Sequence, residues 1–405
     1  MLIVQKYGGT SVGDVERIKN VARRAIAAKK AGHQVVVVVS AMSGETNRLL
    51  KLVHGITERP NEREQDVVVA TGEQVTIGLV SIAIEAAGTR ARSFMGHQCR
   101  IVTDSTFSKA RIKRIDADGI FESLKKGEIA VIAGFQGVDE EGNVTTLGRG
   151  GSDTTAVAIA AAIKADACEI YTDVDGVYTT DPNIAPKAKK LDRISYEEML
   201  ELASLGAKVL QIRSVEIAMK FKVPLWVKSS FSDDPGTLVC EEDEAMEDIL
   251  VSGVALDRNE ARVSIRDVPD QPGAAAKIFG ALDERAISVD LIVQNTPVKG
   301  KTDLTFTVGK ADLLKTQDVM KKVVKALKAG PVEVDDQCAK ISIVGVGMRT
   351  HSGVAARMFK TLSTEGVNIL AISTSEIRVS CLIPGKYAEL AVRALHSEFG
   401  LDTKA

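Results

Sequence analysis

The 405-residue sequence has no long apolar run and no excess of charge of one sign. Its longest aliphatic run near the start, residues 35–39, is far shorter than the roughly 20 apolar residues that cross a bilayer, so no membrane partner is expected. The 52 lysines and arginines are balanced by 54 aspartates and glutamates, which disfavours a nucleic acid as the main partner. The N-terminus lacks the pattern of an export signal. We therefore expect a cytoplasmic protein.

Several common motifs are missing. The five cysteines are scattered and form no Cys-x-x-Cys pair, so neither a zinc site nor a redox dithiol is expected. The glycine-rich segment 8–14 has Asp14 where a P-loop needs its lysine. Gly345-Val346-Gly347 does not continue as a dinucleotide fingerprint. A P-loop NTPase and a nicotinamide dehydrogenase are therefore disfavoured.

Short β-rich runs alternate with helical patterns through the first 240 residues. Strands are predicted at residues 2–4, 35–39, 129–133 and 169–172, with helices at stretches such as 14–30 and 153–164. This alternation predicts an α/β domain whose mostly parallel sheet is covered by helices on both faces. Ligands of such sheets gather at the carboxyl ends of the strands, where glycine-rich turns lead into helices.

A linker and an internal repeat follow. Six of the eight side chains at residues 241–248 are acidic, which predicts an exposed linker after a domain at 1–240. Beyond it, five residues recur after 80 positions: Gly273, Phe279, Leu282, Val289 and Ile292 return as Gly353, Phe359, Leu362, Ile369 and Ile372. Each copy combines strands with an amphipathic helix, which is typical of a small α+β domain. We assign residues 249–338 to the first copy and 339–405 to the second.

Two glycine-rich segments are candidate anion sites. Residues 6–11, Lys-Tyr-Gly-Gly-Thr-Ser, end the first predicted strand, where backbone N–H groups, a helix beginning near Val12 and the charge of Lys6 would converge. The alternative is a plain strand-to-helix turn. Residues 148–153, Gly-Arg-Gly-Gly-Ser-Asp, precede an alanine-rich helix, and Arg149 offers a fork that matches a carboxylate. Here the alternative makes Ser152 or Asp153 simply the helix N-cap; both interpretations are compatible.

An acidic segment, residues 172–182, carries three aspartates within nine residues after the fourth predicted strand. Their spacing is not that of an EF-hand, so a magnesium site and an Asp/Gly turn stay equally open. Glu73 and Lys208 are weak signals when taken individually.

Together these segments resemble the aspartokinase family. The motifs are residues 6–11, 39–42 (Val-Ser-Ala-Met), 71–73 (Thr-Gly-Glu), 148–153 and 171–182, and they stand in that family's order. The duplicated part resembles the family's tandem ACT domains, so the resemblance covers essentially the whole chain. It implies an amino-acid-kinase-like α/β domain followed by two α+β ferredoxin-like ACT domains. It also implies ATP-dependent phosphorylation of the L-aspartate side chain to 4-phospho-L-aspartate, the first step toward lysine, threonine and methionine.

The resemblance implies a role for each matching residue. Lys6 would neutralise the transferring phosphoryl group, Gly8 and Gly9 would donate N–H bonds to it, and Asp153 and Asp181 would orient lysines or metal-bound water. The nucleotide would also contact Thr172, Asp173, Tyr178, Lys208, Val227, Lys228 and Ser229. Aspartate would contact Ser40, Thr46, Glu73, Arg149, Gly150, Gly151 and Ser152, with Glu73 at its ammonium group and Arg149 at its α-carboxylate. Mg²⁺ is expected with ATP, and no direct metal ligand is assigned.

The ACT resemblance implies control by lysine, threonine or both, and residues 270–273 resemble an ACT ligand-binding turn. In the first copy the implied contacts are Asp270, Gly273, Ala274, Ser288, Val289, Asp290, Gln294 and Asn295. In the second copy they are Val354, Ala355, Asn368, Ile369, Ser375 and Glu376, although residues 349–353 depart from the pattern of that turn. Residues 251–256 are suggested to complete the second copy's sheet rather than the first's.

The resemblance further implies a homo-oligomer, or a hetero-oligomer with a shorter regulatory chain that starts at Met246. Three alternatives stay open. The chain could act on glutamate or another substrate of the amino-acid kinases, it could be a catalytically silent amino-acid sensor, or the two copies could serve only oligomerisation. Transfer to a carboxylate suits a chain with only five scattered histidines, because that acceptor is already ionised at neutral pH and needs no general base.

Overall fold

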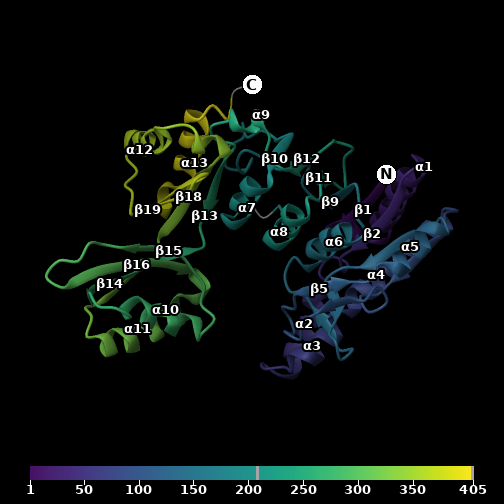
Figure 1. Ribbon diagram of the computed structural model, residues 1–405, viewed down its shortest axis with the longest axis horizontal. Helices are drawn as coiled ribbons and strands as arrows, with labels where there is room; N and C mark the ends of the chain where they lie inside the picture. Colours follow the sequence, from purple (N-terminus) through teal and green to yellow (C-terminus); the bar gives the residue numbers. More distant parts are fainter. Residues whose placement is uncertain (207–208, 403–405) are drawn as a thin grey trace. The chain divides into compact units, whose positions relative to one another are not determined.

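The computed structural model of the chain describes residues 1–206 and 209–402 (Figure 1). These residues divide into two compact units. The first contains most of the chain up to Met246, and the second contains most of the chain after it together with Tyr178–Lys189.

The first unit is built on a mostly parallel sheet. Within the described residues this sheet has eight strands in the order β10-β12-β11-β9-β1-β2-β6-β3, and β11 and β12 run antiparallel to each other. The strands are β1 (Leu2–Tyr7), β2 (Gln34–Val39), β3 (Ala91–Phe94), β6 (Ile129–Ala133), β9 (Ala167–Thr172), β10 (Arg193–Ser195), β11 (Leu225–Ser229) and β12 (Thr237–Cys240). A smaller sheet contains β4 (Ile101–Thr103), β5 (Ile112–Ile115), β7 (Gln136–Val138) and β8 (Val144–Thr146).

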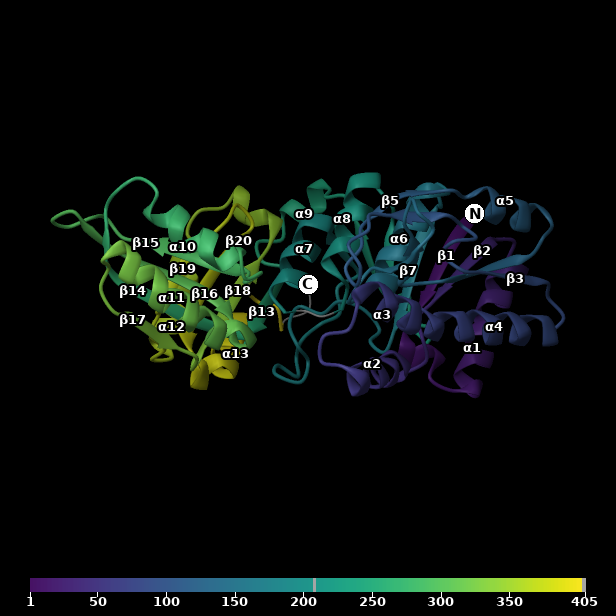
Figure 2. The ribbon, with the colours of Figure 1, turned by 90° about the horizontal axis from the view of Figure 1, so that it is seen from below.

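Helices cover both faces of the main sheet, as Figure 2 shows. On one face α1 (Val15–Lys30) and α4 (Thr71–Ala86) pack against alternate strand residues such as Ile3 and Tyr7. On the other face α6 (Gly151–Ala162) packs against β1, β2 and β9. The other helices of this unit are α2 (Glu45–Ile56), α3 (Glu62–Val69), α5 (Asp118–Lys125), α7 (Tyr196–Ser204) and α8 (Ile212–Phe221). The predicted α/β architecture is confirmed.

The hydrophobicity of the α3–α4 region reflects core packing. By length and composition, residues Glu62–Ala86 could cross a membrane, although half of the most apolar window is buried inside the protein. In α4, Ile77, Val80 and Ile84 belong to the hydrophobic core between the helices and the sheet. The apolar character of α4 is thus explained by the core that it helps to form.

The acidic segment 241–248 differs from the predicted exposed linker. It contains the short helix α9 (Glu244–Glu247), and the side chain of Met246 is only 6% exposed. Glu241 forms an ion pair with Lys222 at 2.7 Å, and Asp243 forms one with Arg193 at 2.6 Å. The prediction of exposure is therefore wrong at Met246, whose apolar side chain is buried while Lys222 and Arg193 offset the repulsion between the acids.

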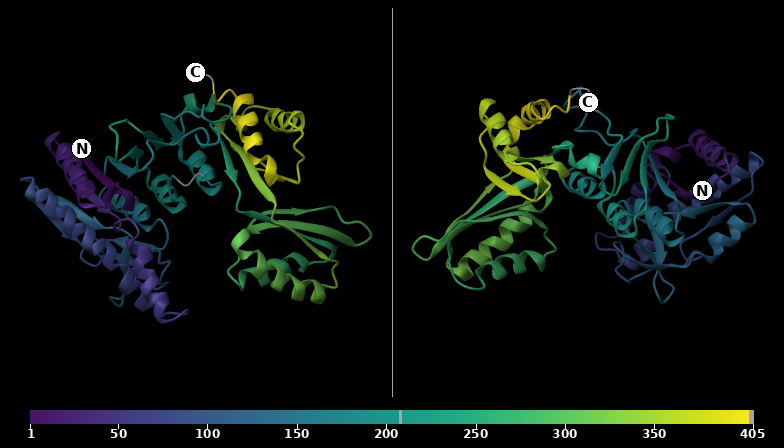
Figure 3. Two further views of the ribbon diagram at one scale, coloured as in Figure 1. Left: turned by 180° about the vertical axis from the view of Figure 1, so that it is seen from behind. Right: turned by 45° about the horizontal axis from the view of Figure 1, so that its top comes forward.

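The second unit contains two four-stranded antiparallel sheets, each with two helices (Figure 3). The first sheet has the order β15-β16-β14-β17, and the second has the order β13-β18-β20-β19. The first copy consists of β14 (Glu260–Pro269), α10 (Ala274–Asp283), β15 (Val289–Gln294), β16 (Lys301–Gly309), α11 (Leu313–Leu327) and β17 (Val332–Asp335). The second consists of β13 (Gly253–Asp257), β18 (Cys338–Val344), α12 (Val354–Thr364), β19 (Ala371–Thr374), β20 (Arg378–Pro384) and α13 (Ala388–Glu398).

Strand β13 precedes the first copy in the chain but pairs with β18 of the second. The first copy is therefore inserted between two neighbouring strands of the second copy's sheet. The repeated glycines have a shared structural cause: Gly273 and Gly353 precede α10 and α12 with φ angles of 89° and 87°, a left-handed conformation that favours glycine. Both sheets are formed from the βαββαβ arrangement, with β13 taking the place of a final strand in the second.

Candidate active site

The predicted motifs meet at one edge of the main sheet. Strands β6, β2, β1, β9 and β11 are consecutive neighbours and run parallel. Their registers align Tyr7 with Val39 and with Tyr171, and Tyr171 with Lys228. The segments that follow these residues therefore emerge side by side at the carboxyl ends of the strands, where α/β proteins bind their ligands.

Lys6 is held at the beginning of α6. Because side chains alternate along a strand, Lys6 points to the face opposite that of Tyr7, which is the face covered by α6. Its Nζ lies 2.6 Å from Oδ1 of Asp153 in the first turn of that helix, and Lys6 is only 8% exposed. The structure thus joins two predicted catalytic residues at a helix N-terminus, where the N–H groups and the helix dipole favour an anion.

The turn after β1 differs from the prediction in two respects. Gly9–Val12 form a 3₁₀ helix, and the α-helix begins only at Val15, after the N-cap Asp14. The N–H of Gly8 donates to the carbonyl oxygen of Tyr171 at 3.2 Å. This bond joins the end of β1 to the end of β9, and the predicted contact of Gly8 with a phosphate stays a prediction.

The glycine-rich turn before α6 is supported by α8. Gly150 is the N-cap of α6, with a φ of 68°, so Ser152 and Asp153 lie within the first turn and neither is the N-cap. The Gln211 side-chain amide donates to the carbonyl oxygen of Arg149 at 2.8 Å, and the Arg213 guanidinium donates to that of Leu147 at 2.6 Å. Sequence reasoning missed these two supports, since nothing in their local pattern relates them to a turn about 60 residues earlier.

Arg149 itself has an exposed side chain. Its carbonyl oxygen is held by Gln211, and the residue directly precedes Gly150, the N-cap of α6. The guanidinium of an exposed arginine can bind a carboxylate ligand through two parallel hydrogen bonds, and no buried interaction has to break first.

Glu73 has the most unusual environment among the predicted residues. It lies in the first turn of α4 and is 2% exposed. One carboxyl oxygen, Oε1, accepts a hydrogen bond from the N–H of Ala41 at 3.0 Å, whereas the buried Oε2 has no partner. Burial raises the pKa of Glu73 to about 7, and the Ala41 hydrogen bond opposes this rise only in part. A buried, unpaired carboxyl oxygen is costly unless a donor reaches it, which fits a cationic group of a ligand.

Two further predicted residues belong to the segment around Ala41, whose N–H contacts this carboxyl. Ser40 follows β2 and donates its N–H to the carbonyl oxygen of Tyr7 at 3.1 Å. Thr46 lies in the first turn of α2. Both residues are partly buried, and the Ala41 that contacts Glu73 lies between them in the chain.

The predicted nucleotide residues are distributed between both units. Thr172 donates its hydroxyl to Asp173 at 3.0 Å, and its carbonyl oxygen accepts from the N–H of Ser230. Val227 is fully buried and Lys228 is paired with Glu169 at 2.6 Å, so neither presents a free side chain. Ser229, at the end of β11, is buried.

Two more of the predicted nucleotide residues lie beyond β9. Tyr178 and Asp181 belong to the second compact unit. The carboxyl group of Asp181 accepts the N–H of Asn183 at 2.9 Å, which makes it a turn residue in this conformation. The predicted Lys208 lies outside the described residues.

In the first copy, most of the predicted effector residues lie on the turn before α10 and along the edge strand β15, and they are exposed. Ala274 is an exception because it is buried in the core of that copy. Asp290 is paired with Lys340 of the second copy. In the second copy, Val354 is buried, Ala355 and Ile369 are half-buried, and Asn368, Ser375 and Glu376 are exposed.

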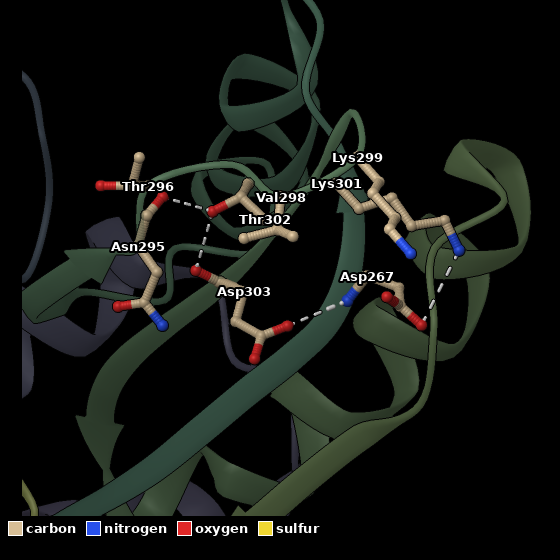
Figure 4. A pocket seen from close by; sticks show the side chains of 8 residues that line it. All are labelled: Asp267, Asn295, Thr296, Val298, Lys299, Lys301, Thr302 and Asp303. Atoms are coloured by element: carbon tan, nitrogen blue, oxygen red, sulfur yellow. Dashed lines mark hydrogen bonds and ion pairs between the residues drawn. The ribbon is translucent and has the colours of Figure 1, made fainter.

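A hollow of about 420 Å³ lies beside this surface in the first copy (Figure 4). Asn295, a predicted effector residue, is one of its lining residues, and the others are Asp267, Thr296, Val298, Lys299, Lys301, Thr302 and Asp303. Lys301 and Asp267 are separated by 3.8 Å, whereas Asp303 is bound by Arg266 and by the N–H of Asp267. Ammonium and carboxylate groups therefore face one small space, which suits a small zwitterion.

Comparisons with known proteins agree with this architecture. The sequence profile of the amino acid kinase family matches residues 1–229, and two ACT domain profiles match residues 262–325 and 341–399. The chain is 57% identical over 406 residues to an aspartokinase of Pseudomonas aeruginosa, and the alignment covers 100% of this chain and 98% of that protein.

Two solved structures of Escherichia coli aspartokinase III extend the comparison, each 29% identical to this chain and aligned over 98% of it and 99% of the other chain. The complex with aspartate and ADP has a TM-score of 0.81, and the complex with lysine and aspartate has a TM-score of 0.79. The resemblance seen in the sequence is confirmed. This chain belongs to the amino acid kinase family and, within it, to the aspartokinases.

Proposed function

We propose that the chain is an aspartate kinase, which transfers the γ-phosphoryl group of ATP to the side-chain carboxylate of L-aspartate. The observation that carries this proposal is Glu73, a buried carboxyl whose Oε2 has no partner beside the strand ends of the sheet. An α-ammonium group would satisfy that oxygen, and the exposed fork of Arg149 would bind the α-carboxylate. Recognition of both α-substituents selects a free amino acid.

The reaction requires two anions to approach each other. A carboxylate oxygen of aspartate attacks the γ-phosphorus, a new O–P bond forms, and the bond to the oxygen bridging the β- and γ-phosphates breaks to release ADP. No proton has to be removed, because a carboxylic acid with a pKa near 4 is ionised at neutral pH. Catalysis consequently depends on positioning and electrostatic stabilisation.

The residues at the N-terminus of α6 would provide that stabilisation. The Lys6 ammonium, the N–H groups of the first turn and the helix dipole all favour the negative charge of a phosphoryl group. Asp153 would keep Lys6 oriented, since its 2.6 Å ion pair fixes the ammonium at the helix end. Thr172, Asp173 and the end of β11 would contact the nucleotide, together with Tyr178, Asp181 and Lys208.

Mg²⁺ would arrive bound to the phosphates of ATP. Within residues 1–206 and 209–402, no three His, Cys, Asp or Glu side chains are grouped so as to hold a metal on their own. The proposed roles of Asp153 and Asp181 are therefore the orientation of lysines or of water molecules on the nucleotide-bound ion.

The two ACT domains would make the enzyme responsive to end products. Lysine, threonine or both are the proposed effectors, since solved relatives include a complex with lysine. The hollow lined by Asn295, Asp267 and Lys301 offers charges of both signs to the α-groups of such a ligand. We further propose a cytoplasmic homo-oligomer, or a hetero-oligomer with a shorter chain that starts at Met246.

The decisive experiment is trapping of the acyl phosphate. Purified protein is incubated with ATP, Mg²⁺ and either aspartate or glutamate, and hydroxylamine converts any acyl phosphate to a hydroxamate. Hydroxamate from aspartate alone supports the proposal. Hydroxamate from glutamate would redirect it to another amino-acid kinase activity, and a lack of product from both would favour a silent amino-acid sensor.

A further inference from the structure

The segment Tyr178–Lys189 belongs to the second compact unit, although its neighbours in the sequence belong to the first. It lies between β9 and β10 of the first unit, yet it packs with the second unit. The carbonyl oxygen of Thr179 accepts a hydrogen bond from the N–H of Val254 in β13 at 2.7 Å. Ile184 packs against the hydrophobic core of the second copy. A segment with two proposed nucleotide contacts, Tyr178 and Asp181, is thus held by the second ACT domain.

A side-chain hydrogen bond strengthens this attachment. His396 on α13 is 2% exposed, and its Nε2 lies 2.9 Å from Oγ1 of Thr179, which is also buried. The same Oγ1 accepts the N–H of Lys189 at 3.0 Å, which closes the segment on itself. Either tautomer of a neutral His396 completes this bond, because the Thr179 hydroxyl has one proton to donate and, beside the Lys189 N–H, a second lone pair that accepts.

We propose that His396 is a positioning residue for ATP, because its bond to Thr179 fixes the segment that carries Tyr178 and Asp181. This inference rests on the proposed function. Thr179 adjoins Tyr178 and lies two residues before Asp181, so anchoring it through both its backbone and its hydroxyl restricts both neighbours before ATP binds. Restriction of a binding segment in advance lowers the entropic cost of binding.

The test compares isosteric variants at both ends of the hydrogen bond. Thr179→Val and His396→Leu remove the bond, whereas Thr179→Ser and His396→Gln retain a hydroxyl or an acceptor. Loss of a hydrogen bond to a buried partner should raise the KM for ATP about fivefold to tenfold and leave the KM for aspartate within about twofold. The double variant Thr179→Val/His396→Leu should be no worse than either single variant, because both break one interaction.

Two results would overturn the inference: equal shifts in both KM values, or additive effects in the double variant. If His396→Leu fails to fold, the Thr179→Val and Thr179→Ser pair carries the kinetic test. Hydrogen exchange of the peptide 178–189 gives a readout that does not require activity. It should accelerate in both disrupting variants while exchange of α6 stays unchanged. If the wild type forms no hydroxamate but this exchange pattern is found, the proposed function fails, whereas the attachment of segment 178–189 through Thr179 and His396 is supported. Unchanged exchange in both disrupting variants would refute that attachment.

Discussion

Glu73→Gln should remove a loss of folding stability that the wild type shows as pH rises, because Glu73 is a buried carboxyl group. Burial raises the pKa of Glu73 from its ordinary value of 4.5 to about 7, so the native state holds this proton more tightly than the unfolded chain. The stabilising contribution of the protonated group is complete below the unfolded pKa and is lost as pH rises through about 7. Glutamine cannot ionise, and its carbonyl oxygen can still accept the Ala41 N–H.

The size of the effect follows from the two pKa values. One pH unit between them corresponds to about 1.4 kcal/mol of stability. Between about pH 5.5 and about pH 8.5, the wild type should therefore lose about 2 kcal/mol relative to Glu73→Gln. The amide also places an N–H₂ group near the unpartnered Oε2 position, which adds a constant offset but no pH dependence.

The single tryptophan makes the measurement specific to the first unit. Trp226 lies in β11 and packs against the core between the sheet and helices α1 and α4, so its fluorescence reports urea unfolding of the unit that contains Glu73. The matched control is Glu85→Gln, an exposed carboxyl on the same helix. A stability difference between wild type and Glu73→Gln that stays constant with pH would refute the reasoning.

Three further substitutions test other parts of the structure. Lys6→Ala should lower turnover by about 10² or more, as measured by hydroxamate formation, and near-normal turnover would remove Lys6 from its role. Gly150→Ala should lower kcat/KM for aspartate about tenfold or more, because a Cβ would lie 2.7 Å from the Gln211 side chain at the turn before α6. Gly142→Ala, with similar backbone strain but open space, is its control and should leave kcat/KM near the wild-type value. Lys340→Met should lower the free energy of unfolding by about 3 kcal/mol or more, because it removes the cation that pairs with Glu260 and Asp290 at the junction of the ACT domains. Urea unfolding followed by circular dichroism measures this, and a loss below about 1 kcal/mol would contradict it.

Four of the strands that frame the site, β1, β2, β6 and β9, were predictable from the sequence because they are mostly buried, whereas β11 was not predicted. β2 is a run of five valines, and β6 is apolar throughout, so no alternation with polar residues obscures them. The small sheet of β4, β5, β7 and β8 was not predicted. Its strands have three or four residues each, and several of these are polar, so no period develops.

The start of α6 shows the limit of local signals. Ser152 and Asp153 are good N-cap residues by type, but the helix begins earlier because Gly150 adopts the left-handed conformation there. Gln211 and Arg213 support that turn from another helix, and the use of the Gly8 N–H by Tyr171 depends on the pairing of β1 with β9. Each of these features depends on a partner far away in the chain.

The sequence by itself determined the buried strands β1, β2, β6 and β9, the places of the glycine-rich turns and which motifs would carry charge, because these properties depend on neighbouring residues alone. Only the tertiary structure decided which strand ends are neighbours and that the Lys6 ammonium meets the Asp153 carboxylate. It also decided that Tyr178–Lys189 packs with the second unit. The physical reason is that such contacts depend on long-range pairing and on shared burial between surfaces, which no local pattern in a single chain specifies.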